Sequence, residues 1–282
     1  MGKGMSTETR SSPDKRVPEP VELQRPWRIM DSGKDELLDF VREFKPSAEV
    51  LRILLYGPTG AGKSSFINSV QRLLLGRNAM SALENSNLTG TTFTKTLNIH
   101  KVKKGSDQSY PLEIVDIMGI EISEGGIKKE DIIQALEGHI SDGYVFNSHT
   151  SIKKDDPKYK KEPTLCDKAH CLVCILPADT VSRMEDHICK VKEIREHASL
   201  LGIPQVIVMT KVDKACELVS KDLKKIYYSK KIKEKVVKCS NTVGIPLNAI
   251  YPVQNYSESI TQDPDTDMLI LTAMRDILNF FQ

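Results

Sequence analysis

The chain has 282 residues, with 40 Lys and Arg against 38 Asp and Glu, which gives a formal net charge of +2. This balance excludes a generally basic nucleic-acid-binding protein, and no DNA partner is expected. No run of about 18 apolar residues is present, so no transmembrane helix is predicted. The first residues also lack the apolar core of a secretory signal, so the six cysteines are expected to be reduced thiols in a cytoplasmic protein.

The amino-terminal part is expected to lie outside the main domain. Residues 1–25 are polar and proline-containing, and they are predicted to form a disordered arm because they cannot bury enough apolar surface. Residues 26–49 are predicted to pack on the main domain with one short helix, because apolar residues recur at helical spacing over 34–44. Trp27, the only tryptophan, is interpreted as the anchor of this segment.

From residue 50 onward, short apolar runs alternate with longer amphipathic stretches, a pattern typical of a parallel sheet covered by helices. The predicted strands lie near 50–56, 95–102, 112–116, 169–176, 205–209 and 249–253. The predicted helices lie near 63–74, 127–141, 182–201, 215–239 (broken) and 266–281. A short polar stretch joins the second and third strands, so they are predicted to form a hairpin. Residues 50–282 are therefore expected to form a doubly wound α/β domain with a mostly parallel six-stranded sheet, one antiparallel strand and an insertion at about 120–168.

A glycine-rich loop separates the first of these strands from the first of these helices. Its sequence, Gly57-Pro58-Thr59-Gly60-Ala61-Gly62-Lys63-Ser64, has the spacing of a phosphate-binding loop. Glycines let backbone N–H groups surround phosphate oxygens, while Lys63 reaches the β- and γ-phosphates and Ser64 ligates Mg²⁺. The predicted nucleotide-binding residues of the loop are Gly57, Thr59, Gly60, Ala61, Gly62, Lys63, Ser64 and Ser65. The loop alone does not distinguish ATP from GTP.

A second motif, Thr210-Lys211-Val212-Asp213, follows the fifth predicted strand and is expected to select the base. The carboxylate of Asp213 accepts two hydrogen bonds that guanine donates and adenine does not, so the motif predicts GTP or GDP and opposes an ATP-dependent enzyme. The stem of Lys211 is expected to cover the base, and Thr210 stands where Asn is commoner.

The loop after the last predicted strand is the third part of the expected nucleotide site. Val253, Gln254 and Asn255 are the predicted residues whose backbone contacts the guanine carbonyl. An ordinary strand–helix turn is the alternative interpretation of this loop.

Two further motifs are predicted to hold Mg²⁺ and sense the γ-phosphate. Asp116, at the end of the third predicted strand, is expected to hold the ion together with Ser64, while the N–H of Gly119 contacts the γ-phosphate. In the threonine-rich stretch 90–94, Thr92 is the residue favoured to contact both Mg²⁺ and the γ-phosphate, and Thr91 is the close alternative. The structural alternatives are a strand-ending Asp beside a turn glycine and a threonine-rich edge strand.

In their order along the chain, these five elements resemble the P-loop GTPase superfamily over residues 50–282. More closely, the chain is similar to the interferon-induced protein 44 family. That similarity rests on Arg25-Pro26-Trp27-Arg28, Gly57 to Asn68, Val115 to Gly119 and Tyr251 to Tyr256. The resemblance implies a cytoplasmic, interferon-responsive GTP-binding protein of innate immunity with antiviral associations. It also leads us to expect that no sizeable domain precedes the G domain, as in the shorter members.

One departure from the GTPase pattern concerns hydrolysis. Ile120 follows Gly119 where small GTPases carry the Gln that orients the attacking water. Glu121, Ser123 and Glu124 are the polar residues that would substitute for it. We therefore predict a GTP-binding switch with weak or assembly-dependent hydrolysis; the alternative is a non-hydrolysing GTP-bound scaffold that acts through protein contacts. A homodimer or protein partner is expected to use the switch loops and residues 120–168.

Two other features are given structural interpretations. Cys171 and Cys174 lie in a predicted strand without a second metal-ligand pair, so they are expected to be buried thiols. The lysine-rich stretch 221–238 is interpreted as a solvated helix face, and a membrane contact is not favoured.

Overall fold

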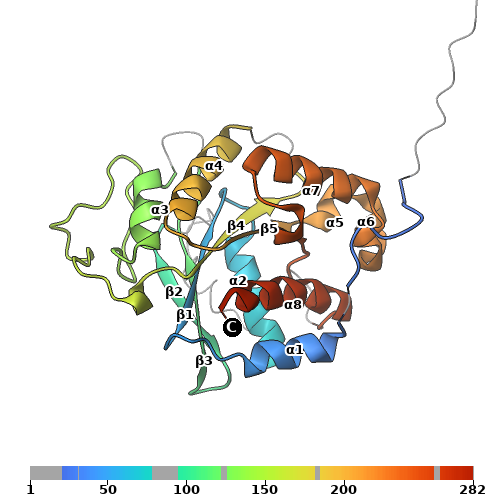
Figure 1. The fold of residues 1–282 in the computed structure, drawn as a ribbon, viewed down its shortest axis with the longest axis horizontal. Coiled ribbons are helices and arrows are strands. Elements are labelled where there is room, and N and C mark those ends of the chain that lie inside the picture. Colours follow the sequence, from blue (N-terminus) through green and yellow to red (C-terminus); the bar gives the residue numbers. More distant parts are fainter. Residues whose placement is uncertain are drawn as a thin grey trace, which may run out of the picture.

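A six-stranded sheet forms the centre of the molecule (Figure 1). The computed structural model describes residues 21–30, 32–77, 95–121, 126–181, 185–256 and 261–281. The strand order is β2-β3-β1-β4-β5-β6, and every neighbouring pair is parallel except the β2–β3 hairpin. The strands are β1 (Leu51–Tyr56), β2 (Asn98–Lys103), β3 (Ser109–Asp116), β4 (Cys171–Pro177), β5 (Gln205–Thr210) and β6 (Ile250–Pro252). The predicted fold class, including the single antiparallel strand, is confirmed.

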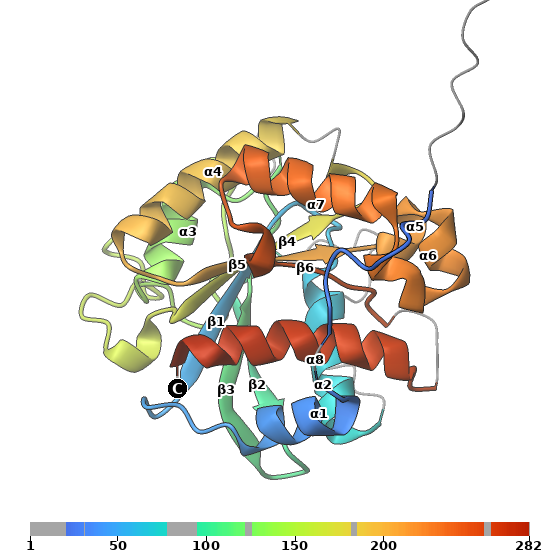
Figure 2. The same ribbon diagram turned by 45° about the vertical axis from the view of Figure 1, so that its right-hand side comes forward.

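Helices cover both faces of this sheet. Figure 2 shows α4 and α7 on one face and α2 and α8, with α1 outside them, on the other. The helices are α1 (Lys34–Glu43), α2 (Lys63–Leu75), α3 (Lys129–Leu136), α4 (Glu185–Leu200), α5 (Val212–Ala215), α6 (Glu217–Lys221), α7 (Lys230–Val243) and α8 (Pro264–Leu278). Because both faces are covered, the central strand β4 is buried along its whole length, which explains its continuous apolar sequence. Among the described residues, no helix combines the length and apolar composition needed to cross a membrane.

The ends of the predicted helices differ from the structure by a few residues, and two of the predicted helices differ more. The helix expected over 127–141 ends at Leu136, because Gly138 adopts a φ of 83° and lies so close to Asp167 that a Cβ there would approach its carbonyl carbon to 2.7 Å. The broken helix expected over 215–239 consists of α5, α6, a short 3₁₀ segment Leu223–Tyr227 and α7.

The segment that precedes the sheet is fastened to the carboxyl-terminal half of the chain. The backbone N–H of Trp27 donates to the carbonyl of Tyr227 (2.9 Å), and the two rings pack edge to face at 5.0 Å. The guanidinium of Arg28 donates to the carbonyl of Ile250 (2.8 Å) and lies over the rings of Trp27, Tyr227 and Tyr251. Trp27 is thus an anchor, and α1 then packs against α8. Residues 1–20, most of the predicted arm, lie outside the described residues.

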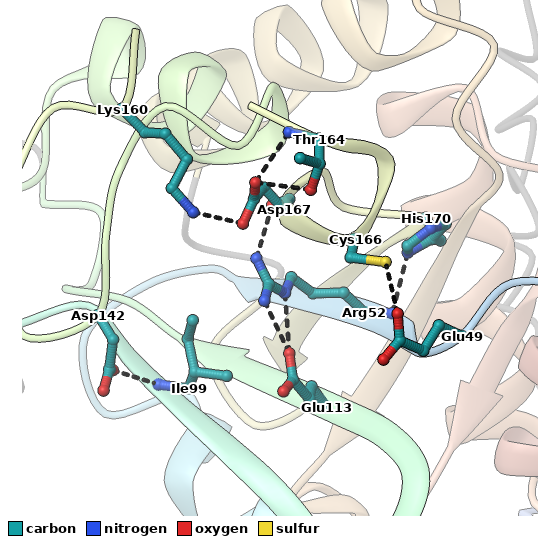
Figure 3. A network of polar contacts seen from close by, with 10 residues as sticks. All are labelled: Glu49, Arg52, Ile99, Glu113, Asp142, Lys160, Thr164, Cys166, Asp167 and His170. Atoms are coloured by element: carbon teal, nitrogen blue, oxygen red, sulfur yellow. Dashed lines mark hydrogen bonds and ion pairs between the residues drawn. The ribbon is translucent and has the colours of Figure 1, made fainter. Parts of the chain in front are cut away.

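The region between α3 and β4 is tied to the amino-terminal ends of β1 and β4 by a polar network (Figure 3). The guanidinium of Arg52 donates to Glu113 Oε2 (2.8 and 3.1 Å) and to the carbonyl of Asp167 (2.6 Å), while the Arg52 N–H donates to His170 Nδ1 (3.0 Å). Burial opposes ionisation of Asp167, but hydrogen bonds from Lys160 and Thr164 outweigh it and lower the pKa of this carboxyl to about 2. This network lies at the opposite end of the parallel strands from the predicted nucleotide loops.

Candidate nucleotide-binding site

The glycine-rich loop occupies the carboxyl end of β1 and leads directly into α2, which begins at Lys63. Gly57, Gly60 and Gly62 have φ angles of 143°, 71° and 98°, a region that other residues rarely adopt. A Cβ at Gly57 would lie 2.2 Å from the carbonyl oxygen of Ile175 in β4, so no larger residue fits there. The spacing of the glycines therefore sets the path of the loop around the amino end of α2, where the helix dipole favours an anion.

The cation of Lys63 lies within this loop. Its side chain is buried, and its Nζ donates to the carbonyls of Gly57 and Pro58, both at 3.4 Å. Burial lowers the pKa of Lys63, and the nearby negative charge of Asp116 partly offsets that effect. The ammonium group is thus held between backbone carbonyls of the loop with one carboxylate nearby.

Ser64 and Asp116 meet at the point where β3 ends beside α2. The hydroxyl of Ser64 donates to Asp116 Oδ2 at 2.6 Å, and Asp116 is 1% exposed. Burial raises the pKa of Asp116, although Lys63 and the Ser64 hydroxyl oppose that rise. Among the described residues, Asp116 Oδ1 has no hydrogen-bond partner, so an oxygen suited to a hard cation is left over. Thr92, the third predicted metal ligand, and its alternative Thr91 lie outside the described residues.

The segment after Asp116 is bound to the phosphate loop by backbone hydrogen bonds. The Ile120 N–H donates to the Gly57 carbonyl (3.0 Å), and the Thr59 N–H donates to the Ile120 carbonyl (3.3 Å). Gly119 lies so close to Thr59 that a Cβ at Gly119 would be 2.3 Å from the Thr59 Oγ1. The side chain of Ile120 is 1% exposed and belongs to the core, so it offers no polar group to a bound nucleotide.

Glu121 has a contact that sequence reasoning did not identify. The hydroxyl of Thr59 donates to Glu121 Oε1 at 3.1 Å, which joins the phosphate loop to the residue after Ile120. The only sequence signal was that Glu121 is a polar residue shortly after Ile120. Ser123 and Glu124 are also polar residues in this stretch. Those two residues lie outside the described part of the chain.

The base-selecting motif is tied to the phosphate loop through Thr210. Its buried hydroxyl donates to the Ala61 carbonyl at 2.6 Å. Lys211 has a φ of 57° and is the one described residue other than glycine with a positive φ; the turn it makes starts α5. Asp213 lies in the first turn of α5 and is half-buried. The structure thus brings Thr210, Lys211 and Asp213 to the same edge of the sheet as Lys63.

The loop after β6 contacts the phosphate loop through a side chain. Asn255 Nδ2 donates to the Gly62 carbonyl at 3.1 Å, a role that the sequence did not indicate. Val253 is fully buried, and its N–H donates to the Met209 carbonyl at 2.8 Å. With the Val253 amide engaged in this way, Gln254 and Asn255, both half-buried, are left as the predicted contacts to a guanine carbonyl.

Tyr256 connects this loop to three helices. Its backbone N–H donates to the hydroxyl oxygen of Ser69 in α2 (3.0 Å), and its ring centroid lies 4.0 Å from the guanidinium of Arg72. Its hydroxyl donates to Asp267 Oδ1 in α8 (2.8 Å), and Lys34 of α1 pairs with Asp267 Oδ2 (2.7 Å). No sequence motif identified this cluster.

The cysteines take no part in a metal site within the described residues. Cys171 and Cys174 are fully buried in β4, and burial raises the pKa of both thiols, as expected for structural cysteines. All six cysteines are free thiols. The described ranges hold no group of three or more His, Cys, Asp or Glu that would bind a metal ion.

Comparison with known proteins adds three findings. Residues 52–211 match the family described as 50S ribosome-binding GTPase. Interferon-induced protein 44-like from Homo sapiens is 33% identical over 251 residues, which cover 87% of this chain and 55% of that protein. Interferon-induced protein 44 from Homo sapiens is 34% identical over 250 residues, 87% of this chain and 56% of that protein. The chain therefore spans about half the length of these curated relatives, and the predicted resemblance to them is confirmed.

Among solved structures, a crystal structure described as a probable GTP-binding protein engB is similar with a TM-score of 0.39 and 14% identity. The similar region covers 72% of this chain and 88% of that one. The family match includes the phosphate loop, Asp116, Thr210 and Lys211. Asp213 and the loop after β6 lie beyond it.

Proposed function

We propose that this protein is a GTP-binding switch protein. The chain belongs to the family described as 50S ribosome-binding GTPase, because the family model matches more than half of the chain. The observation that carries this proposal is the arrangement around Lys63. A buried ammonium, a serine hydroxyl and a buried carboxylate meet where a glycine-rich loop enters a helix. This combination of backbone donors, one cation and two oxygen ligands suits a nucleotide polyphosphate with Mg²⁺.

Each part of the nucleotide has a proposed set of partners. The backbone of residues 57–65 and the Lys63 ammonium bind the phosphates, and Ser64 and Asp116, with the predicted Thr92, hold Mg²⁺. The leftover carboxylate oxygen of Asp116 supports this assignment, since Mg²⁺ prefers oxygen ligands. The ion, when bound, neutralises charge on the β- and γ-phosphates.

The base is proposed to be guanine. Asp213 accepts from its ring N–H and exocyclic amine, the stem of Lys211 covers one face, and the loop with Gln254 and Asn255 contacts the carbonyl. The bonds from Thr210 to Ala61 and from Asn255 to Gly62 support this proposal, because they join the base-side loops to the phosphate loop.

The names of the curated relatives, which describe them as interferon-induced, support the proposal that this chain is interferon-responsive. A cytoplasmic location and a role in innate immunity are proposed with it. Hydrolysis is proposed to be weak in the isolated chain or dependent on assembly, through a homodimer or protein partner at the switch loops and residues 120–168. The burial of Ile120 favours a second candidate, a GTP-bound scaffold that does not hydrolyse its nucleotide.

The test is a titration of the purified chain with labelled GTP, GDP and ATP, with and without Mg²⁺. We expect guanine nucleotides to bind much more tightly than ATP and Mg²⁺ to strengthen the binding of GTP. Equal affinity for ATP and GTP, or no binding of either, would refute the proposed function. Following the γ-phosphate over time at several protein concentrations then separates the switch from the scaffold.

A further inference from the structure

A carboxylate lies beside the phosphate loop at the point where Ile120 supplies no polar group. We propose that Glu121, held by the hydroxyl of Thr59, positions the water molecule that attacks the γ-phosphate of GTP. This inference rests on the proposed function, since it concerns hydrolysis at the same site. It assigns to Glu121 the task that a glutamine at position 120 would otherwise perform.

The backbone geometry determines which side chain faces the nucleotide. Ile120 forms a parallel bridge with Pro58 and is held by the Gly57 carbonyl and the Thr59 N–H at 3.0 and 3.3 Å. Ile120 is buried in the core, whereas Glu121 is half-buried and its carboxylate reaches Thr59 in the phosphate loop.

The contact with Thr59 places this carboxylate beside the predicted γ-phosphate position. Glu121 Oε1 accepts from the Thr59 hydroxyl at 3.1 Å. The same hydroxyl lies against Gly119, whose N–H is the predicted contact of the γ-phosphate. The hydroxyl and the carboxylate thus form a pair beside Gly119, on the side of the loop where we propose that the γ-phosphate binds.

Glu121 is also fixed by its backbone. Lys190 of α4 donates from its Nζ to the Glu121 carbonyl at 2.5 Å. On the other side, Gly126 packs so closely that a Cβ there would lie 2.4 Å from the Glu121 N. A group that is positioned before the substrate arrives pays little further ordering cost in the transition state, which is the property required of a water-orienting residue.

The reaction step is an in-line displacement. The oxygen of the water held by Glu121 forms a bond to the γ-phosphorus, and the bond between that phosphorus and the β–γ bridging oxygen breaks. GDP leaves with the electron pair of that bond. The proton of the water passes to the Glu121 carboxylate and from there to the released phosphate, which restores the carboxylate.

The opposite role is an inhibitory one, in which the carboxylate repels the γ-phosphate and must move away before GTP binds. The two roles predict opposite effects of removing the charge. A water-orienting Glu121 leaves GTP affinity unchanged and slows hydrolysis when it is lost, whereas an inhibitory Glu121 strengthens GTP binding when it is lost.

The experiment compares Glu121→Ala, Glu121→Gln, Thr59→Val and Thr59→Ser with the unmodified chain and with Glu196→Ala, which removes an exposed carboxylate on α4 as a matched control. Single-turnover hydrolysis of preloaded GTP measures the chemical step, and labelled-nucleotide titration measures binding. A third measurement needs no turnover: the gain in GDP affinity caused by aluminium fluoride, which mimics the transferring phosphoryl group.

We expect Glu121→Ala to slow single-turnover hydrolysis on the order of 100-fold, the usual contribution of a positioned proton acceptor. It should also abolish the aluminium fluoride effect while leaving GDP and GTP affinity within about twofold. Thr59→Val should be impaired more than Thr59→Ser, which keeps the hydroxyl, and Glu196→Ala should match the unmodified chain.

Three results would overturn the inference. They are an unmodified chain that binds GTP but shows no hydrolysis, a Glu121→Ala variant that hydrolyses GTP as fast as the unmodified chain, and a Glu121→Ala variant that binds GTP more tightly. All three leave GTP binding, and with it the proposed binding switch or scaffold, intact. Failure of the unmodified chain to bind guanine nucleotide refutes the proposed function and the inference together.

Discussion

Replacing Thr210 with valine removes the hydroxyl that joins the end of β5 to the phosphate loop and changes little else, because valine has nearly the same shape. The lost bond is 2.6 Å long and buried, and it leaves the Ala61 carbonyl without that donor. A buried acceptor left without a partner costs about 1–3 kcal/mol. We therefore expect Thr210→Val to lower the free energy of unfolding by about 1–3 kcal/mol.

A matched control is available in the same chain. Thr242 donates from its hydroxyl to the Lys238 carbonyl at 2.8 Å, but its side chain is exposed on α7, so water replaces the bond in Thr242→Val. Guanidinium unfolding of both variants measures the difference, and Thr242→Val should lose less than about 0.5 kcal/mol. Equal losses in the two variants would show that burial of the Thr210 bond contributes nothing, and the reasoning from this contact would be wrong.

Further predictions address the nucleotide and the buried charges. Asp213→Asn should weaken GTP binding and improve binding of xanthine nucleotide, and unchanged selectivity in competition assays would contradict the proposed base contact. Lys63→Ala and Ser64→Asn should each abolish tight GTP binding while circular dichroism stays native; normal titrations of both would count against the site. Dilute protein should hydrolyse GTP slowly, with specific activity rising with protein concentration, and fast hydrolysis independent of concentration would argue against assembly. Burial raises the pKa of Asp131 to about 6, so ionisation destabilises the fold as pH rises from about 4 to about 6. Over this range, Asp131→Asn should therefore gain stability relative to the unmodified chain, by at most about 3 kcal/mol. Denaturant unfolding at several pH values measures the gain, and a gain that does not depend on pH would contradict the raised pKa of Asp131.

The sheet and the phosphate loop were predictable because their determinants are local in sequence. The apolar run of β4 and the spacing of Gly57, Gly60 and Gly62 constrain the backbone without help from distant residues. The helix end at Leu136 was not predictable, because it depends on the close approach of Gly138 to Asp167.

Contacts within the candidate site were harder to predict than its members. The pair of Thr59 and Glu121 joins two loops whose approach is decided by the backbone bridge at Ile120. Asn255 was identified as a candidate for contacting the base, yet its side-chain amide donates to the Gly62 carbonyl. This bond forms because the fold brings the loop after β6 next to the phosphate loop. Sequence patterns predict which residue types follow each strand. They do not predict which side chains form hydrogen bonds with a neighbouring loop.

The contacts of Tyr256 connect α1 with the loop that we propose to contact the guanine. Lys34 holds Asp267, Asp267 holds the Tyr256 hydroxyl, and Tyr256 continues the loop that carries Gln254 and Asn255. A protein that bound α1 and moved it away from α8 would separate Lys34 from Asp267 and weaken the position of Tyr256. Such a movement would lower the affinity for the base while leaving the phosphate loop unchanged. By reciprocity, a bound nucleotide resists that displacement with the same free energy. Nucleotide binding and the docking of a partner on α1 would then be thermodynamically coupled, so that each changes the affinity of the other by the same factor.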